Sequence, residues 1–206
     1  VFQGFGSGAF SDFNGLDTRS EAERRADYLH RVDLVKLGLA GNLKDYTLTT
    51  YDGKTVLGAQ LDYNGQGAGF ASQPAENVNY VDAHDNETLF DLVTYKMPAD
   101  APMDHRVRMS LISQASVALS QSPSFWASGT EMLRSKSLDR DSFNSGDYYN
   151  AIDWTMHDNG FGHGLPVKSK NGAAWDHMRP LLENPDLKPT PEKIDSSSEI
   201  AMDFLR

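Results

Sequence analysis

The densest group of chemically active side chains is the run from Asp82 to Glu87, which reads Asp-Ala-His-Asp-Asn-Glu. A His beside an Asp can hydrogen-bond a pair of substrate hydroxyl groups, while the Asp carboxylate stabilises positive charge that develops during a reaction. The alternative is structural: Asp85 or Asn86 would cap a helix that begins near Glu87, because Asp and Asn are preferred N-cap residues. The sequence leaves both interpretations open.

A second group lies in a long polar segment, about 134–166, which shows no helical or strand period. Sugars present apolar C–H faces ringed by hydroxyl groups, so a groove that binds them needs aromatic rings beside carboxylates and amides. For each residue alone, the commoner role is that of a solvated loop in which Arg and Asp neutralise each other. Together they predict a sugar-binding loop, and its members are Arg134, Lys136, Asp139, Arg140, Asp141, Phe143, Asp147, Tyr148, Tyr149, Asn150 and Trp154.

Metal and cofactor chemistry receives little support. The 206 residues include no Cys, which excludes disulfides, thiolate nucleophiles and Cys-based zinc sites. His84, His157 and His163 have carboxylates nearby in sequence, but no pair of His residues has the i, i+4 spacing of a zinc hydrolase. We expect these His residues to be hydrogen-bonding groups, and we identify no cofactor.

The elements that must position these groups alternate between short apolar runs and amphipathic segments. Residues 78–81 predict a short buried strand that ends at the Asp82 run, where ligands gather in parallel α/β folds. The order predicts an α/β fold, either an open doubly wound sheet or a segment of a (β/α)8 barrel. The other predicted elements are helices over about 19–40, 87–97, 103–121 and 172–184, a hairpin around Asp52-Gly53, a short strand from 123, and a helix reaching the C-terminus.

The overall composition limits the kinds of binding partner that we expect. Lys and Arg total 19 against 29 Asp and Glu, which gives a formal net charge of −10 and argues against a nucleic-acid partner. Hydrophobic residues make up 39%, as in ordinary globular proteins. We expect no membrane partner and no signal peptide in this sequence, because no apolar run approaches the roughly 18 to 20 residues that span a bilayer.

Four segments together resemble one enzyme family. The stretch VNYVDAHDNETLFD at 78–91 resembles the fourth conserved region of the α-amylase superfamily of glycoside hydrolases, in the form found in type I pullulanases. GLAGNLKDY at 38–46, LDYNGQGAGFA at 61–71 and EMLRSKSLDRDSFNSGDYYN at 131–150 resemble further pullulanase segments in the expected order. The resemblance runs over nearly the whole sequence.

The resemblance implies a fold and a reaction. Residues 1–206 would form the C-terminal portion of the catalytic barrel, roughly the last three β/α units of a (β/α)8 TIM barrel, with a substrate-facing loop at about 134–166. The parent enzyme would cleave α-1,6-glucosidic linkages of pullulan, starch or glycogen with retention, through a carboxylate nucleophile and a carboxylic acid. It would be an extracellular bacterial protein, the resemblance allows calcium in it, and this segment would need the rest of the barrel.

The resemblance also implies roles for single residues. Asp85 matches the carboxylate that stabilises the transition state, and His84 matches the His that hydrogen-bonds the sugar at the cleavage subsite. Asn86 would line the neighbouring subsite. Asp147 and Asn150 would bind glucose units in the long loop.

Two family motifs are missing from the sequence. The nucleophile strand, roughly Gly-Phe-Arg-Phe-Asp, and the Gly-Glu-Gly-Trp type motif of the acid do not occur, and Arg31-Val32-Asp33 lies in a predicted amphipathic helix. Two function classes therefore remain: a segment of a debranching hydrolase, or a non-catalytic α-glucan-binding fragment. A generic α/β hydrolase with a His-Asp pair is a distant third, because the Ser nucleophile motif G-x-S-x-G does not appear.

Overall fold

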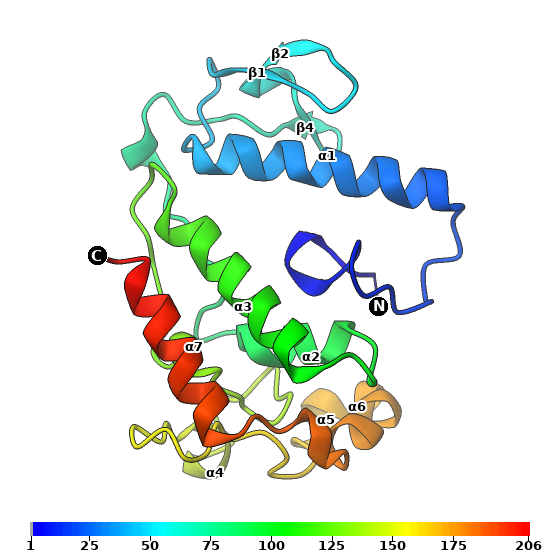
Figure 1. The fold of residues 1–206 in the computed structure, drawn as a ribbon, viewed down its shortest axis with the longest axis vertical. Helices are drawn as coiled ribbons and strands as arrows, with labels where there is room; N and C mark the ends of the chain where they lie inside the picture. Colours follow the sequence, from blue (N-terminus) through cyan, green and yellow to red (C-terminus); the bar gives the residue numbers. More distant parts are fainter. Residues whose placement is uncertain (1) are drawn as a thin grey trace.

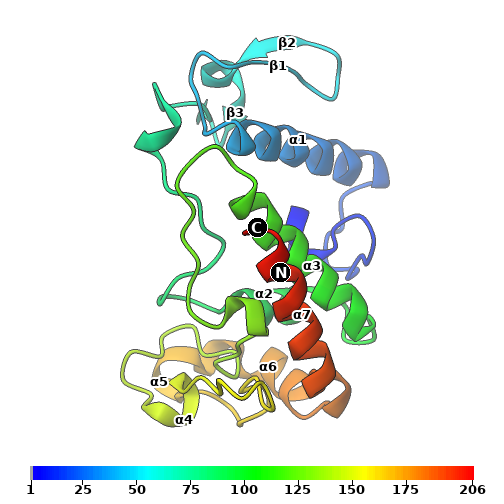
Figure 2. The ribbon, with the colours of Figure 1, turned by 60° about the vertical axis from the view of Figure 1, so that its left-hand side comes forward.

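Helices carry most of the regular structure in the computed structural model, which describes residues 2–206. Figures 1 and 2 show α1 and two small hairpins at one end of the molecule, α4 to α6 at the other, and α3 running between them. None of the described helices combines the length and apolar character needed to cross a membrane. The helices are α1 (Glu21–Leu39), α2 (Leu89–Lys96), α3 (Met103–Ala118), α4 (Asp147–Asn150), α5 (Lys168–Asn171), α6 (Trp175–Leu182) and α7 (Pro191–Asp203).

The strands form two separate antiparallel hairpins. Strand β1 (Thr47–Thr49) pairs with β2 (Thr55–Leu57) around the predicted Asp52-Gly53 turn, and β3 (Asp62–Tyr63) pairs with β4 (Gln66–Gly67). Gly53 has φ +81°, the left-handed conformation that favours glycine in tight turns. Leu48 of the first hairpin packs on Leu37 of α1, which fixes the hairpin end of the molecule.

The predicted partial (β/α)8 barrel is wrong for this structure. Within residues 2–206 the only sheets are the two hairpins, and neither contains a parallel pair of strands. The segment 78–81, predicted as a buried strand, makes a single parallel bridge between Asn79 and Ser124. Its apolar side chains are largely exposed, Val78 at 54% and Tyr80 at 60%. Val81 is half-buried and packs against the cluster that contains Leu89 and Val93 of α2. Because Val78 and Tyr80 stay exposed and the run makes one bridge only, residues 78–81 form neither a buried strand nor a paired ladder.

The predicted helices at 19–40, 87–97 and 103–121 are confirmed, with shifted ends. Helix α1 begins at a capping box, in which the Ser20 hydroxyl accepts a hydrogen bond from the Glu23 amide and the Glu23 carboxylate accepts one from the Ser20 amide. Helix α2 packs against α3, and α3 packs against α7 (Figure 1). The helix predicted at the C-terminus is α7, which begins earlier, at Pro191, a residue preorganised for the first helical turn.

One apolar cluster joins α2 and α3 to the long polar segment. Phe90 of α2 meets Phe161 edge to face, with ring centroids 5.9 Å apart. Leu133 and Leu138, which flank the start of the long segment, are fully buried in the same cluster. The beginning of the predicted sugar-binding loop is thus anchored in the core.

Candidate functional site

Four of the five residues predicted for the site line one open cleft. His84 and Asp85 form one wall, and Asp147 and Asn150 form the other. The cleft is open to solvent and has a volume of about 380 Å³, and Phe143 adds an aromatic ring to its lining. The fold thus brings together two segments that are far apart in the sequence. Asn86 does not line the cleft.

The first wall is a turn that precedes α2. The N-cap of α2 is Thr88, whose hydroxyl accepts a hydrogen bond from the Asp91 amide, and the Asp82 carboxylate accepts one from the Leu89 amide at 3.0 Å. Neither Asp85 nor Asn86 caps this helix, so the capping interpretation is wrong. Asn86 instead has φ +60°, a left-handed conformation that Asn tolerates better than most residues.

The His84 and Asp85 side chains face solvent. They are 90% and 80% exposed, and His84 Nε2 lies 3.6 Å from Asp85 Oδ2. Both groups can therefore reach a ligand in the cleft. Water also screens the charge of Asp85 in this arrangement, because Coulomb interactions weaken as the surrounding dielectric constant rises.

The second wall is built around the short helix α4. Gly146 precedes it with φ +70°, and Asp147 is its exposed first residue. The Asn150 side-chain amide donates to the carbonyl oxygens of Ser142 at 2.7 Å and Gly146 at 3.0 Å. Asn150 thereby holds the turn that carries Asp147. The Phe143 ring beside it is exposed, as an aromatic platform for a sugar requires.

A smaller cavity of about 80 Å³ lies next to the cleft and shares His84 and Asn150 with it. Its polar lining includes Asp82, Arg134 and Lys136. The Thr130 hydroxyl donates to the Asp82 carboxylate at 2.9 Å, and burial raises the pKa of Asp82. Burial also lowers the pKa of both Arg134 and Lys136. Asp82 and Lys136 are therefore buried in the packed structure, and Arg134 is half-buried.

Lys136 and Arg134 are the residues whose position the sequence did not reveal. The solvated-loop interpretation is wrong for Lys136, which is only 3% exposed. Its ammonium group donates to the carbonyl oxygens of His84 at 3.2 Å and Asn86 at 2.7 Å. The available signal was the flanking pair Leu133 and Leu138, since apolar residues on both sides of a short polar run indicate that the run enters the core.

The described part of the chain contains no group of side chains arranged as a metal site. Across residues 2–206, no three His, Asp or Glu side chains are placed to hold a metal ion together. His157 Nδ1 lies 3.0 Å from the Thr155 hydroxyl, and His163 Nδ1 lies 3.0 Å from the Tyr148 carbonyl oxygen. Calcium in the parent enzyme stays a prediction.

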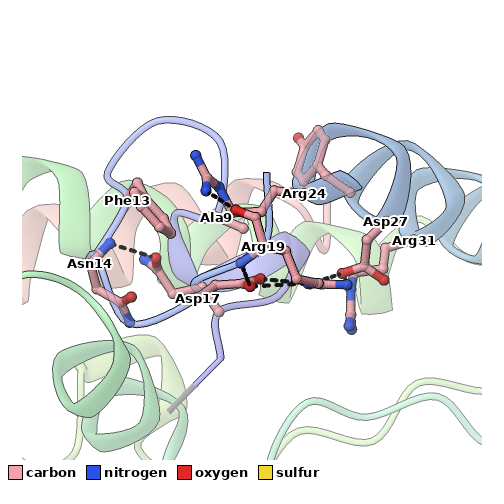
Figure 3. Close-up of a pocket in the computed structure, with 10 residues that line it drawn as sticks. Ala9, Phe13, Asn14, Asp17, Arg19, Arg24, Asp27 and Arg31 are labelled. Carbon is pink, nitrogen blue, oxygen red and sulfur yellow. Dashed lines mark hydrogen bonds and ion pairs between the residues drawn. The ribbon is translucent and has the colours of Figure 1, made fainter. Parts of the chain in front are cut away.

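A further, narrow pocket of about 20 Å³ lies between the N-terminal segment and α1 (Figure 3). Its charged groups pair with one another: Arg19 contacts Asp17 at 2.6 Å and Asp27 at 3.2 Å, and Arg31 contacts Asp27 at 3.0 Å. Arg24 lies over the Phe13 ring, 4.2 Å from its centroid. These contacts attach the N-terminal segment to α1. We assign the pocket a structural role.

Comparison with known proteins gives a consistent family. Residues 156–206 match the family described as alpha-1,6-glucosidases, pullulanase-type, C-terminal. The chain is 42% identical over 205 residues to pullulanase 1, chloroplastic, from Arabidopsis thaliana, which covers 99% of this chain and 21% of that protein. It is 45% identical over 174 residues to the pullulanase of Klebsiella aerogenes, covering 84% of this chain and 16% of that protein.

Solved structures agree with the sequence matches. The maltotriose complex of PulA from Klebsiella pneumoniae has a TM-score of 0.91 at 38% identity, covering 98% of this chain and 21% of that chain. PulA from Klebsiella oxytoca has a TM-score of 0.91 at 37% identity, covering 98% of this chain and 19% of that chain. The chain thus spans about a fifth of the length of these relatives.

For residues 156–206 the family match corrects the predicted position within the enzyme. The matched residues belong to a C-terminal family of pullulanase-type enzymes, and they give no support to the assignment of 1–206 to the catalytic barrel. The resemblance to pullulanases is confirmed at the coarser level. The chain is a homologue of one segment of the pullulanases, and its residues 156–206 match the pullulanase-type alpha-1,6-glucosidase C-terminal family.

Proposed function

We propose that this chain is a segment of a starch-debranching glycoside hydrolase that cleaves α-1,6-glucosidic linkages of pullulan, starch or glycogen with retention. We further propose that the cleft between His84 and Asp147 binds the α-glucan. The observation that supports this most directly is the convergence of His84, Asp85, Asp147 and Asn150 on one cleft with an exposed aromatic ring. Relatives of the same fold include maltotriose complexes, which supports a glucan as the ligand.

Asp85 has the transition-state role in this proposal. A neutral sugar ring acquires positive charge only as the glycosidic bond breaks, so a nearby carboxylate stabilises the transition state more than the bound substrate. Asp85 is 80% exposed in this segment, where water weakens such an effect. We therefore propose that, in an intact enzyme as long as these relatives, segments outside residues 1–206 cover the open side of the cleft and supply the nucleophile and the acid.

The test is Asp85→Asn in the intact protein, assayed for release of reducing sugar from pullulan. We expect kcat to fall roughly hundredfold or more, as when a preorganised electrostatic group is lost, while KM changes little. Asp45→Asn is the matched control, because Asp45 is exposed beside the β1–β2 hairpin at the opposite end of the molecule (Figure 1). An effect of Asp85→Asn on KM alone would make Asp85 a ground-state binding residue.

A binding measurement separates the enzyme from the alternative, a non-catalytic α-glucan-binding fragment. Calorimetry with maltotriose and the intact protein measures the affinity of the cleft for a glucan independently of hydrolysis. Binding that Asp147→Ala weakens, in a protein that hydrolyses pullulan, supports the proposal. The same binding in an intact protein that leaves pullulan unchanged would favour the alternative.

A further inference from the structure

We propose that Arg134 and Lys136 are positioning residues that hold the two walls of the cleft in place, Lys136 at the turn that carries Asp85 and Arg134 at the helix that carries Asp147. This inference rests on the proposed function of the cleft. Both cations act through main-chain carbonyl groups, and neither is among the residues that line the open cleft.

Lys136 holds the turn that carries Asp85 through hydrogen bonds to its backbone. Its ammonium group donates to the carbonyl oxygens of His84 and Asn86, the two residues that flank Asp85. A buried ammonium group without partners is costly, so these bonds hold both the lysine and the turn in one arrangement. The left-handed conformation of Asn86 points its carbonyl oxygen toward this partner. Lys136 thereby fixes the backbone from which the Asp85 side chain projects.

Arg134 holds the wall of the cleft that carries Asp147 and Asn150 through a hydrogen bond to its backbone. Its Nη2 donates to the Asn150 carbonyl oxygen at 2.6 Å, and its Nη1 lies 3.4 Å from the Ser128 carbonyl oxygen. The Asn150 side chain in turn holds the Ser142 and Gly146 carbonyl groups, so this contact extends to the turn before α4. A shift of Arg134 would release the helix end that presents Asp147 and Asn150.

The segment that carries both cations is itself fixed to α2. The Ser135 hydroxyl donates to one oxygen of the Asp91 carboxylate, and the Lys136 amide donates to the other at 2.8 Å. The Ser135 amide also donates to the Asn159 carbonyl oxygen at 2.7 Å. Asp91 lies in the first turn of α2, directly after the Asp85 turn. A closed circuit of contacts therefore runs from the turn, through α2 and residues 134–136, back to the turn.

The two cations predict different kinetic effects. Asp85 acts on charge in the transition state, so Lys136→Met in the intact protein should lower kcat on pullulan roughly hundredfold, the cost of an ångström-scale misplacement, with KM little changed. Lys136→Arg, which keeps a charged donor, should recover part of that loss. Arg134→Met loosens a wall that binds sugar away from the reacting carbon, so it should mainly raise KM.

Two controls separate positioning from general stability. Lys54→Met removes an exposed lysine at a hairpin turn and should leave activity unchanged. Arg106→Met removes a fully buried cation that donates to the Thr94 and Pro98 carbonyl groups, outside the cleft. It should lower the melting temperature while kcat per folded molecule stays the same. If Lys136→Met behaves like Arg106→Met, Lys136 is only structural and the proposal is wrong.

Hydrogen–deuterium exchange tests the inference without any reaction. Lys136→Met should speed exchange of the amides at 84–89, and Arg134→Met should speed exchange at 142–151, each with little effect on the other wall. Equal or absent changes in both walls would overturn the inference. Lys136→Gln, which keeps a neutral donor, replaces the Met variant if that variant does not fold. An unchanged kcat in Asp85→Asn together with these selective exchange changes would refute the transition-state role of Asp85 and leave the positioning intact.

Discussion

The Asp91 carboxylate accepts a hydrogen bond from the Ser135 hydroxyl and so ties the first turn of α2 to a segment 44 positions away. The other carboxylate oxygen accepts from the backbone amides of Lys136 at 2.8 Å and Leu138 at 3.2 Å. Burial raises the pKa of Asp91 to about 6, and these three hydrogen bonds oppose that shift by stabilising the charged form. The Asp91 carboxylate thus fixes the backbone of the turn that contains Arg134 and Lys136.

The raised pKa of Asp91 predicts a pH dependence of stability. In the unfolded chain the carboxyl group has its ordinary pKa of 3.8, so the folded state binds a proton more tightly. The contribution of Asp91 to the free energy of unfolding is therefore fully present below about pH 4, and it is lost as the pH rises through about 6. A shift of two units corresponds to at most about 3 kcal/mol.

The measurement compares the wild type with Asp91→Asn. Asn keeps the shape and one acceptor but does not titrate. The difference in free energy of unfolding, wild type minus variant, should decrease between pH 4 and pH 7 and stay level above that. Contributions of all other groups largely cancel in this difference. Parallel curves over the whole range would show that Asp91 has an ordinary pKa in the folded state.

Asn150 offers a prediction about substrate binding. Asn150→Ala in the intact protein removes two hydrogen bonds that hold the turn before α4, and with them the position of Asp147. Because this wall would hold ground and transition states alike, we expect KM for pullulan to rise several-fold with a smaller change in kcat. Steady-state kinetics on pullulan checks the split. A fall in kcat at constant KM would place Asn150 next to the reacting carbon.

The isolated 206-residue chain should associate with itself or bind hydrophobic dyes. Its accessible surface is 11103 Å², whereas a folded monomer of 22.8 kDa typically exposes about 9,600 Å². Part of the excess is apolar: Tyr80 and Phe125 meet edge to face at 6.2 Å and are both exposed. Size-exclusion chromatography with light scattering, together with dye fluorescence, measures this directly. A monomer with a cooperative melt and no dye binding would contradict the expectation.

Several elements could be predicted because their signals are local. The Asp52-Gly53 turn and the amphipathic patterns of the segments 19–40 and 103–121 each act over neighbouring residues, and each predicted element is present. The family resemblance rests on contiguous segments and is confirmed by relatives of the same fold. The pairing of His84 and Asp85 with the Asp147 loop followed from that resemblance and not from periodicity; both groups do line one cleft, and their roles there remain predictions.

The tertiary structure alone decided which groups are buried. Val78 and Tyr80 of the predicted buried strand are exposed. Lys136, in a polar segment, is instead buried, and its ammonium group donates to the carbonyl oxygens of His84 and Asn86. Periodicity reports how a segment would sit against a neighbour, but it carries no information on whether a neighbour is present. Burial depends on elements that are distant in the sequence. Here the Asp91 carboxylate of α2 accepts hydrogen bonds from the Lys136 and Leu138 amides, which offsets the cost of burying the polar backbone of this turn.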